Sequence, residues 1–356
     1  GFLKDSDFVN QLKLRVSYGQ TGKVNFPSYA AKTVYQTYDR WYATGFGVNL
    51  IALGNENLKW ETTNKLNVGT DLQFWNERIS LNFDYYYNKT VDLITDVTLP
   101  SSSGFVTYKD NLGETLNEGF DIQVRFDVYK SKDWNVSLWG NLNHNENKIL
   151  KVSNALRAYN EQVDEHFQVA ENAQNGRNPS RDETYSTPVM KYEEGASLTS
   201  IFAVRSLGID PVTGKELFLN RDGSVSNTWN SIQQVRVGDE EPKASGSFGL
   251  NLVYKNLSLF ASFSYDWGKQ TYNQTLVDEV ENADIQYSNV DRRALTARWQ
   301  NPGDITTLKD IKDINSVTMP SSRFVQDDNE LSLSAVTLSY DFNTNWIKKM
   351  RLKMLR

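Results

Sequence analysis

The sequence has no cysteine among its 356 residues. Disulfide bonds, thiolate metal sites and cysteine nucleophiles are therefore excluded. No apolar run approaches the roughly 18 residues that a membrane-spanning helix needs. The formal net charge of -6 argues against a nucleic-acid partner, because nucleic-acid-binding surfaces are basic.

The residue patterns of common catalytic and metal sites are missing as well. The only histidines, His144 and His166, have no second histidine or carboxylate at metal-ligand spacing. The sequence contains no GxSxG, HExxH or P-loop motif. Adjacent carboxylates such as Asp327 and Asp328 lie in polar stretches, which is typical of solvated charge. We predict no catalytic residue, no bound metal, no cofactor and no enzymatic activity.

Alternation with a period of two dominates the chain, and it predicts strands with two different faces. In residues 78–94, hydrophobic residues occupy one phase and polar residues the other. Hydrophobic residues are only 39% of the chain while aromatic residues reach 12%. That balance suits a thin apolar surface better than a thick core.

The same alternation predicts nine strands, at residues 10–20, 60–75, 78–94, 113–129, 133–149, 244–255, 256–267, 330–342 and 349–356. A change of phase between Ala335 and Val336 predicts a bulge in the eighth strand. Short and long connections alternate, with long ones at 21–59, 95–112, 150–243 and 268–329. This segregation is typical of outer-membrane barrels, which have short periplasmic turns and long extracellular loops. The predicted fold is therefore all-β, an antiparallel up-and-down transmembrane β-barrel of which this chain holds about nine strands.

Aromatic residues gather at the strand ends beside the short turns, as expected for a girdle at the membrane–water interface. They are Phe74, Trp75, Tyr129, Trp134, Tyr254, Phe342 and Trp346. His144 falls on the apolar phase of its strand near the loop end, which predicts an interface position.

Two groups of residues are candidates for function. The first would line a wet lumen because its members fall on the polar phase of their strands; they are Asp84, Asp121, Arg125, Asn141 and Ser262. The second is an aromatic group in the first long loop, Tyr35, Tyr38, Trp41 and Tyr42. Its rings would pack the loop against itself, contact a partner protein or stack on a ligand.

Several segments resemble SusC/RagA TonB-dependent transporters. The most characteristic is Asn111-Leu112-Gly113 followed by Asn117-Glu118-Gly119-Phe120-Asp121. Others, in chain order, are Gly54–Glu61, Asn67–Asp71, Asp84–Leu93, Leu99–Phe105, Gly208–Gly214, Val237–Asp239, Trp299–Asp304 and Ser321–Val325. Each match alone is weak, but their order and spacing over residues 10–356 make the resemblance strong.

The resemblance implies the C-terminal part of a barrel of about 22 strands with a plugged lumen. Residues 1–356 would then be a partial barrel, with the plug domain and the earlier strands outside this chain. It implies the outer membrane of a Gram-negative, Bacteroidetes-type cell and uptake of a large nutrient, either a glycan oligosaccharide or a peptide. The implied partners are TonB, outer-membrane lipid and a SusD-like surface lipoprotein docked on the long loops.

Two other hypotheses remain open at this point. A passive porin would have a similar lumen and would differ in lacking a plug. A soluble β-rich carbohydrate-binding or adhesive module would explain the aromatic residues and polar loops, but not the alternation of short and long connections.

Overall fold

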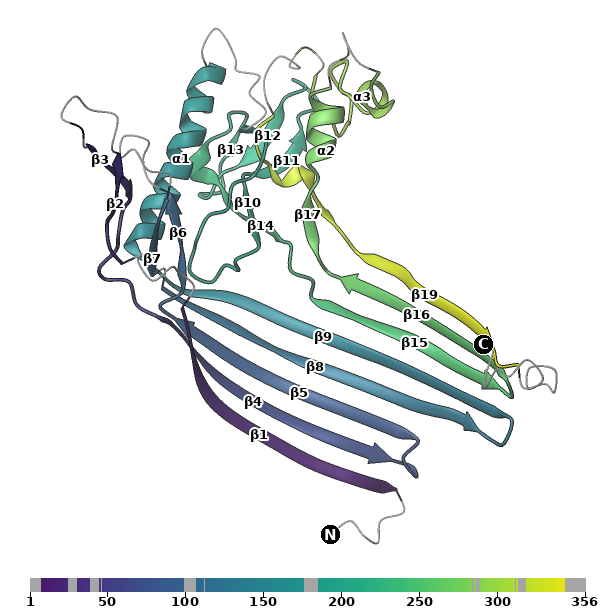
Figure 1. The fold of residues 1–356 in the computed structure, drawn as a ribbon. Coiled ribbons are helices and arrows are strands. Elements are labelled where there is room, and N and C mark those ends of the chain that lie inside the picture. The colour runs from purple at the N-terminus through teal and green to yellow at the C-terminus, as the bar shows by residue number, and fades with distance from the viewer. Residues whose placement is uncertain are drawn as a thin grey trace.

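The computed structural model describes residues 8–24, 31–38, 45, 47–98, 107–111, 113–175, 185–283, 285, 289–310, 312 and 318–342. Its main feature is one eight-stranded sheet in the order β1-β4-β5-β8-β9-β15-β16-β19. Every pairing within it is antiparallel and each strand pairs with the next one of the sheet along the chain. The sheet is curved (Figure 1), so it forms part of a barrel wall, and we call it the wall.

The wall strands are long, between 11 and 19 residues. They are β1 Val9–Lys23, β4 Glu61–Phe74, β5 Ile79–Val91, β8 Gly113–Lys130, β9 Trp134–Val152, β15 Ala244–Tyr254, β16 Leu257–Trp267 and β19 Glu330–Tyr340. Eight of the nine predicted strands are thereby confirmed, and the ninth, at 349–356, lies outside the described residues. The pairing of β16 with β19 shifts register beside Ala335, so the predicted bulge is present one residue earlier than expected.

Tight turns join the wall strands at one end only (Figure 1). The β4–β5 turn holds three consecutive non-glycine residues at positive φ, Trp75 at 53°, Asn76 at 55° and Glu77 at 63°. The β15–β16 turn similarly holds Lys255 at 50°. Aromatic pairs occur at these ends, such as Trp134 with Tyr254 at 4.3 Å between ring centroids. Trp346, also predicted for this girdle, lies outside the described residues.

The long connections are more structured than the sequence analysis expected. The first holds the hairpin of β2 Val34–Tyr38 and β3 Gly47–Ala52, and the second that of β6 Ile94–Thr98 and β7 Thr107–Asn111. The third begins with α1 Asn154–Asn175 and continues with β10 Ser200–Ala203, β11 Arg205–Ile209, β12 Glu216–Leu219, β13 Val225–Ser226, η3 Ser231–Gln233 and β14 Val235–Asp239. The fourth holds β17 Gln270–Tyr272, α2 Gln274–Leu276, η4 Val277–Glu281, α3 Arg293–Thr296, η6 Ser322–Phe324 and β18 Val325–Asp327. The long connections at 150–243 and 268–329 are therefore present as predicted, and they also contain helices and strands that the period-two alternation did not predict.

The described residues of 153–243 and 268–329 gather above the loop end of the wall (Figure 1), and we call them the cap. The cap has a core of its own, made of Val163, Phe167, Val204, Phe218, Trp229 and Met319. A second cluster holds Val280, Ala283, Ala294 and Leu308. Among the described residues, none of the helices has the length and apolar character needed to cross a membrane.

Candidate functional site

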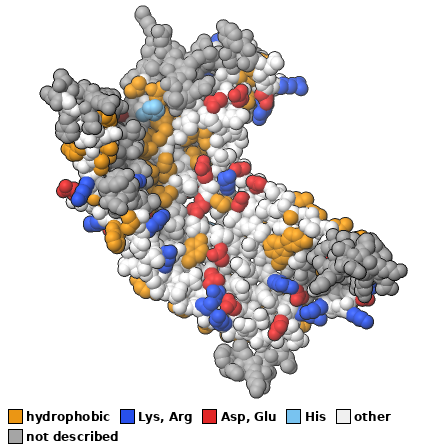
Figure 2. All heavy atoms as spheres, viewed as in Figure 1, with side chains coloured by type: hydrophobic (Ala, Val, Ile, Leu, Met, Phe, Trp, Pro, Cys, Tyr) orange, Lys and Arg blue, Asp and Glu red, His pale blue; other side chains and the backbone are white. Residues whose placement is uncertain are grey.

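The wall has two chemically different faces, because the antiparallel register places alternate residues of neighbouring strands on the same side. On the apolar face, large hydrophobic side chains point outward; Leu14 is 74% exposed and Leu338 is 67% exposed. The polar face carries serine, asparagine, glutamine and charged side chains. Figure 2 looks onto the polar face, where red acidic and blue basic side chains lie over the strands.

A row of register partners that includes three charged residues crosses five strands of the polar face. The charged row consists of the successive register partners Arg15, Gly69, Asp84, Asp121 and Asn143. Arg15 Nη2 donates to Asp84 Oδ2 at 2.9 Å and to Asp71 Oδ1 at 2.8 Å. The guanidinium thus crosses a whole strand, from β1 over β4, to reach β5.

Glycine at position 69 makes that crossing possible. A β-carbon there would overlap Asp84 Oδ1 and lie 3.0 Å from Arg15 Nη2. The absence of a side chain on β4 therefore opens the space in which an ion pair between β1 and β5 forms.

Asp84 and Asp121 lie directly opposite each other on β5 and β8. Like charges in such cross-strand pairs are destabilising unless something offsets them. Arg15 offsets Asp84, and Asn143 Nδ2 donates to Asp121 Oδ1 at 2.6 Å. Both aspartates of the charged row are therefore partnered, Asp84 by a cation and Asp121 by an amide.

A second row, the amide row, lies one step nearer the turns. Its register partners are Asn82, Gln123, Asn141 and Ser247. Asn141 Oδ1 accepts from the backbone N–H of Ser247 and from its hydroxyl at 2.9 Å. The side chains of Asn82 and Gln123 are exposed and form no hydrogen bond with any described residue.

The next row carries an aromatic ring onto the polar face. This tryptophan row consists of Ser80, Arg125, Trp139, Gly249 and Ser262. The indole of Trp139 lies across Gly249, where a β-carbon would be 2.6 Å from Trp139 Cζ2. Phe260 adds a second ring, nearly parallel to the first at 6° and with 6.3 Å between centroids.

A concavity of about 450 Å³ lies on the polar face beside the amide and tryptophan rows. Its lining includes Ser80, Asn82, Gln123, Arg125, Trp139 and Asn141. The one charged side chain in this lining is Arg125, whose Nε donates to Asp127 Oδ1 at 3.2 Å.

A larger concavity of about 540 Å³ lies at the loop end of the wall, between β9 and the β14–β15 connection. Glu241 reaches into it and accepts hydrogen bonds from Asn145 Nδ2 and from the N–H of Asn147. His144 also lines it, and its Nδ1 donates to Lys243 O at 2.6 Å, because a carbonyl can only accept. These contacts tie the top of β9 to the segment that enters β15.

The five residues predicted for a lumen are brought together on one face. Asp84 and Asp121 lie in the charged row, Asn141 in the amide row, and Arg125 and Ser262 in the tryptophan row. Together they span five strands, from β5 to β16. The structure thus gives them a common surface.

The loop aromatics are not brought together in the same way. Tyr35, which is 61% exposed, and Tyr38 are three residues apart on β2, so their side chains lie on opposite faces. The Tyr38 hydroxyl donates to Gln36 Oε1 at 2.8 Å. Trp41 and Tyr42 lie outside the described residues.

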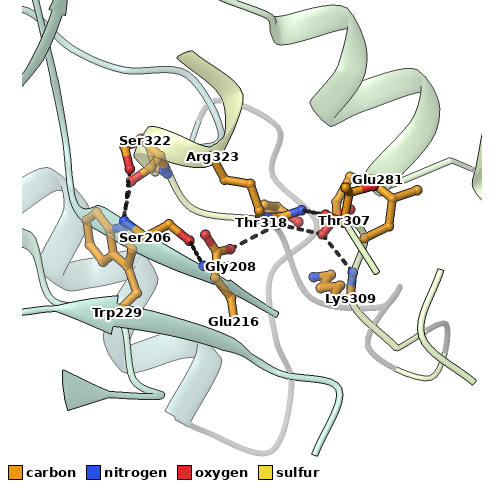
Figure 3. A network of polar contacts seen from close by, with 12 residues as sticks. Ser206, Gly208, Glu216, Trp229, Glu281, Thr307, Lys309, Thr318, Ser322 and Arg323 are labelled. Carbon is orange, nitrogen blue, oxygen red and sulfur yellow. Dashed lines mark hydrogen bonds and ion pairs between the residues drawn. The ribbon is translucent and has the colours of Figure 1, made fainter. Parts of the chain in front are cut away.

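A buried ion network joins distant parts of the cap (Figure 3). Arg323 Nη2 donates to Glu216 Oε2 at 3.0 Å and to Glu281 Oε1 at 2.7 Å, and Nη1 donates to Thr307 O at 2.6 Å. Glu281 is fully buried. Burial by itself lowers the pKa of Arg323, but the charges of Glu216 and Glu281 outweigh it and raise the pKa above its ordinary value. Glu216, Glu281 and Arg323 belong to β12, η4 and η6, so the network fixes these elements to one another.

Asp239, at the end of β14, is a second polar anchor of the cap. It accepts hydrogen bonds from Ser197 Oγ at 2.5 Å and Thr199 Oγ1 at 2.7 Å. Partial burial raises the pKa of Asp239, but the bonds from Ser197, the Glu241 N–H, Thr199 and Ser200 outweigh it, and the pKa lies below its ordinary value. Within the described part of the chain, no group of three or more histidine, aspartate or glutamate side chains is placed to hold a metal ion.

Sequence reasoning did not identify Arg15, Trp139 or Glu241 as site residues. Arg15 lies on the polar phase of the first strand. Its partner Asp84 is 69 residues away in the sequence, and the ion pair between them depends on the space left by Gly69. Trp139 occupies the polar phase of an otherwise polar run, and that exception was the available signal.

Comparison with known proteins gives one family match and several relatives. The family described as TonB dependent receptor-like, beta-barrel matches residues 6–186, just over half of the chain. TonB-dependent receptor P3 of Formosa agariphila is 27% identical over 87% of this chain and 33% of its own length. TonB-dependent receptor SusC of Bacteroides thetaiotaomicron is 24% identical over 97% of this chain and 33% of its own length. The chain thus spans about a third of the length of the curated relatives that it matches.

Solved structures give the same fold. The structure titled the RagAB peptide transporter superposes with a TM-score of 0.74 at 24% identity, over 96% of this chain and 35% of that one. The RagAB peptide importer in the open-open state gives 0.75 at 24% identity, over 97% and 35%. At this identity the likeness shows the fold alone.

Proposed function

This chain belongs to the TonB-dependent receptor-like β-barrel family, and on that premise we propose that it forms part of the wall of a transporter that takes up a large nutrient under TonB control. It is an outer-membrane β-barrel segment. The polar face would line the lumen, with Asp84, Asp121, Arg125, Asn141 and Ser262 in contact with its contents, and the apolar face would contact lipid.

The observation that carries the proposal is the chemical difference between the two faces of one layer. A soluble sheet hides its apolar face under a second layer. Here Leu14 and Leu338 are 74% and 67% exposed, while the opposite face carries the charged and amide rows. Burying such side chains in lipid instead of water stabilises them by about 25 cal/mol per Å² of apolar area. A lipid environment outside and water inside therefore accounts for both faces.

The nutrient class is an oligosaccharide or a peptide. The relative SusC and the RagAB peptide transporter support these two candidates by resemblance. We propose no catalytic role for any residue of the chain.

The cap is the proposed docking surface for a SusD-like surface lipoprotein. It stands on the loop side of the wall and holds a core of its own, so it offers a preformed surface. The loop aromatics Tyr35, Tyr38, Trp41 and Tyr42 would add contacts to that partner. Contact with TonB would come from parts of the protein outside this chain.

Growth of the source bacterium tests the proposal. Strains lacking the full-length gene, and strains lacking TonB, are compared with the parent on single glycans and on peptide digests. We expect at least one of these nutrients to support growth only when both the gene and TonB are present. Growth that needs the gene but not TonB would point to a passive porin instead.

A further inference from the structure

The apolar face of the wall consists of runs of outward-facing residues that begin and end at definite positions. On β5 the run consists of Ile79, Leu81, Phe83, Tyr85 and Tyr87, and on β9 it consists of Trp134, Val136, Leu138, Gly140 and Leu142. The next outward residues toward the loops are Lys89 on β5 and His144 and then Glu146 on β9. Counted from first to last member, 79 to 87 and 134 to 142, each run covers nine residues of its strand. A strand needs about 9–11 residues to cross the hydrocarbon layer of a membrane, so each run matches one crossing.

The two runs have the same length but lie at different levels of the sheet. Ile79, Phe126 and Leu138 are successive register partners on β5, β8 and β9. The run of β5 begins in this row, at Ile79, because the turn to β4 precedes it. On β9 the run begins at Trp134, which is four residues nearer the turns than Leu138. The turn-side edge of the apolar face is therefore displaced between these strands.

The loop-side edge is displaced in the same way. One register row crosses five strands from β1 to β9 and consists of Tyr18, Leu66, Tyr87, Glu118 and Glu146. Its members are apolar or aromatic on β1, β4 and β5, and acidic on β8 and β9. On β9 the last apolar residue is Leu142, four residues nearer the turns than Glu146. Both edges are thus displaced in the same direction and by the same number of residues.

The tilt of barrel strands in a membrane accounts for this displacement. Such strands tilt by about 35–45°, so a register row, which runs perpendicular to the strands, climbs through the membrane. Neighbouring strands are roughly 4.8 Å apart, and the four steps from Tyr18 to Glu146 therefore rise by roughly 11–14 Å. An apolar band of constant height must then be met at a different residue on each strand.

Charged side chains follow the loop-side edge and are paired with one another. Lys148 Nζ lies 3.0 Å from Glu146 Oε1 and 3.3 Å from Glu118 Oε1. Lys89 Nζ lies 2.7 Å from Glu114 Oε2. All five residues fall on the outward phase of their strands, and we call these contacts the outward ion pairs. Charges on the outside of a barrel are tolerated near the membrane interface and not at the bilayer midplane, so the outward ion pairs belong in the headgroup layer.

We propose that the outer boundary of the hydrocarbon layer crosses the wall obliquely, and that the outward ion pairs contact lipid headgroups. The boundary passes on the loop side of Tyr18, Leu66 and Tyr87 and on the turn side of Glu118 and Glu146. The loop ends of β8 and β9 then stand above the hydrocarbon layer and hold the cap in water. The inference rests on the proposed function, because it requires lipid on the apolar face, and it deepens that function by identifying the lipid contacts.

The test measures the depth of five outward positions in the full-length protein, in vesicles of phosphatidylethanolamine and phosphatidylglycerol. Single cysteines carry a nitroxide label in the variants Tyr18→Cys, Tyr87→Cys, Glu118→Cys, Leu142→Cys and Glu146→Cys. Depth is obtained from the ratio of collisions with dissolved oxygen to collisions with a water-soluble nickel chelate. Leu142→Cys is the matched control for Glu146→Cys, because both lie on the same face of β9. Each side of the boundary is sampled at two or more positions, so one variant that fails to fold leaves the test intact.

We expect labels at residues 18, 87 and 142 to collide mainly with oxygen, and labels at 118 and 146 mainly with the nickel chelate. Labels at 18 and 146 should differ in depth by roughly 11–14 Å, although the two residues belong to one register row. Equal depth at these two positions would overturn the oblique boundary. Shielding of 18 and 87 from both reagents would also overturn it, since a protein would then cover them. Aqueous readings at 18, 87 and 142 together would remove lipid from the apolar face, and the transporter proposal would fail as well.

Discussion

In the wall, large hydrophobic side chains such as Leu14 and Leu338 are 74% and 67% exposed, whereas in the cap Phe167, Phe202 and Phe324 are at most 1% exposed. The wall is one layer whose apolar face has no covering within the described residues. The cap exposes some hydrophobic side chains, such as Ile305 at 91%, but it also has buried hydrophobic clusters of its own and buries a pair of glutamates. The wall thus takes its stability from its surroundings and from strand pairing, while the cap is stabilised by its own packing.

The largest loss of cap stability is expected when the cation of its buried ion network is removed. Arg323→Met leaves Glu216 and Glu281 buried without a countercharge, which should cost about 3–5 kcal/mol of local stability. We expect faster hydrogen exchange in β11 and β12 and unchanged exchange in the wall strands.

The matched control is Arg293→Met. Arg293 forms an exposed pair with Asp291, and such pairs contribute about 0–1 kcal/mol. Equal exchange in the two variants would contradict a cap held by its own buried network.

The stability of the wall should instead depend on whether a substituted side chain contacts lipid or water. Two neighbouring residues of β8 allow the comparison: Val124 lies on the apolar face and is 38% exposed, and Gln123 lies on the polar face. Val124→Lys should cost about 2–4 kcal/mol if the site lies near the bilayer midplane, and Gln123→Lys should cost little. Urea unfolding of the full-length protein in vesicles measures both, and equal losses would argue against lipid on the apolar face.

A smaller effect is expected where glycine leaves room for a neighbour. Gly69→Ala introduces a β-carbon that overlaps Asp84 and displaces the Arg15 ion pair, at a cost of about 1–3 kcal/mol. Gly19→Ala is the control, since a β-carbon there meets nothing within 4 Å. If both variants unfold at the same urea concentration, the gap at Gly69 has no energetic role.

The smallest effect is a pH dependence confined to the cap. Because the pKa of Asp239 is depressed, its contribution is present above the pKa of the unfolded state, roughly 3.9, and is lost as the pH falls through the folded pKa. The hydrogen-exchange protection factors of β14, which are corrected for the intrinsic exchange rate at each pH, should therefore fall between pH 5 and pH 3 by more than those of β8. Asp239→Asn should remove most of this difference, and a variant that keeps it would show that another group titrates.

The wall was more predictable from sequence than the cap, for a physical reason. Period-two alternation is local, so it located eight strands and the bulge near Ala335. The resemblance to SusC/RagA transporters is confirmed at the level of the family. The cap core, in contrast, brings together residues that are far apart in the sequence, such as Val163 and Met319, and no local sequence pattern predicts such a contact.

Part of the cap did carry a local signal that the sequence analysis did not use. Leu156, Tyr159, Val163 and Phe167 recur every three or four residues, which is the period of an amphipathic helix. Ser153 Oγ also accepts from the N–H of Leu156 at 3.3 Å, as a helix N-cap does. For the candidate site, the alternating phase correctly placed five residues on one face. The rows across the wall depend on the register between strands, and that register cannot be predicted from sequence where long connections join the strands.

The most direct measurement of the central claim is a spin-label scan along β8 in the full-length protein in lipid, made with single cysteines at residues 122 to 126. This chain has no cysteine of its own to remove. Gln123→Cys and Arg125→Cys should report collisions with a water-soluble nickel chelate. Ile122→Cys, Val124→Cys and Phe126→Cys should report collisions with lipid-dissolved oxygen. Equal accessibility at all five positions, or the reversed pattern, would contradict a wall with lipid on its apolar face and a wet lumen on its polar face.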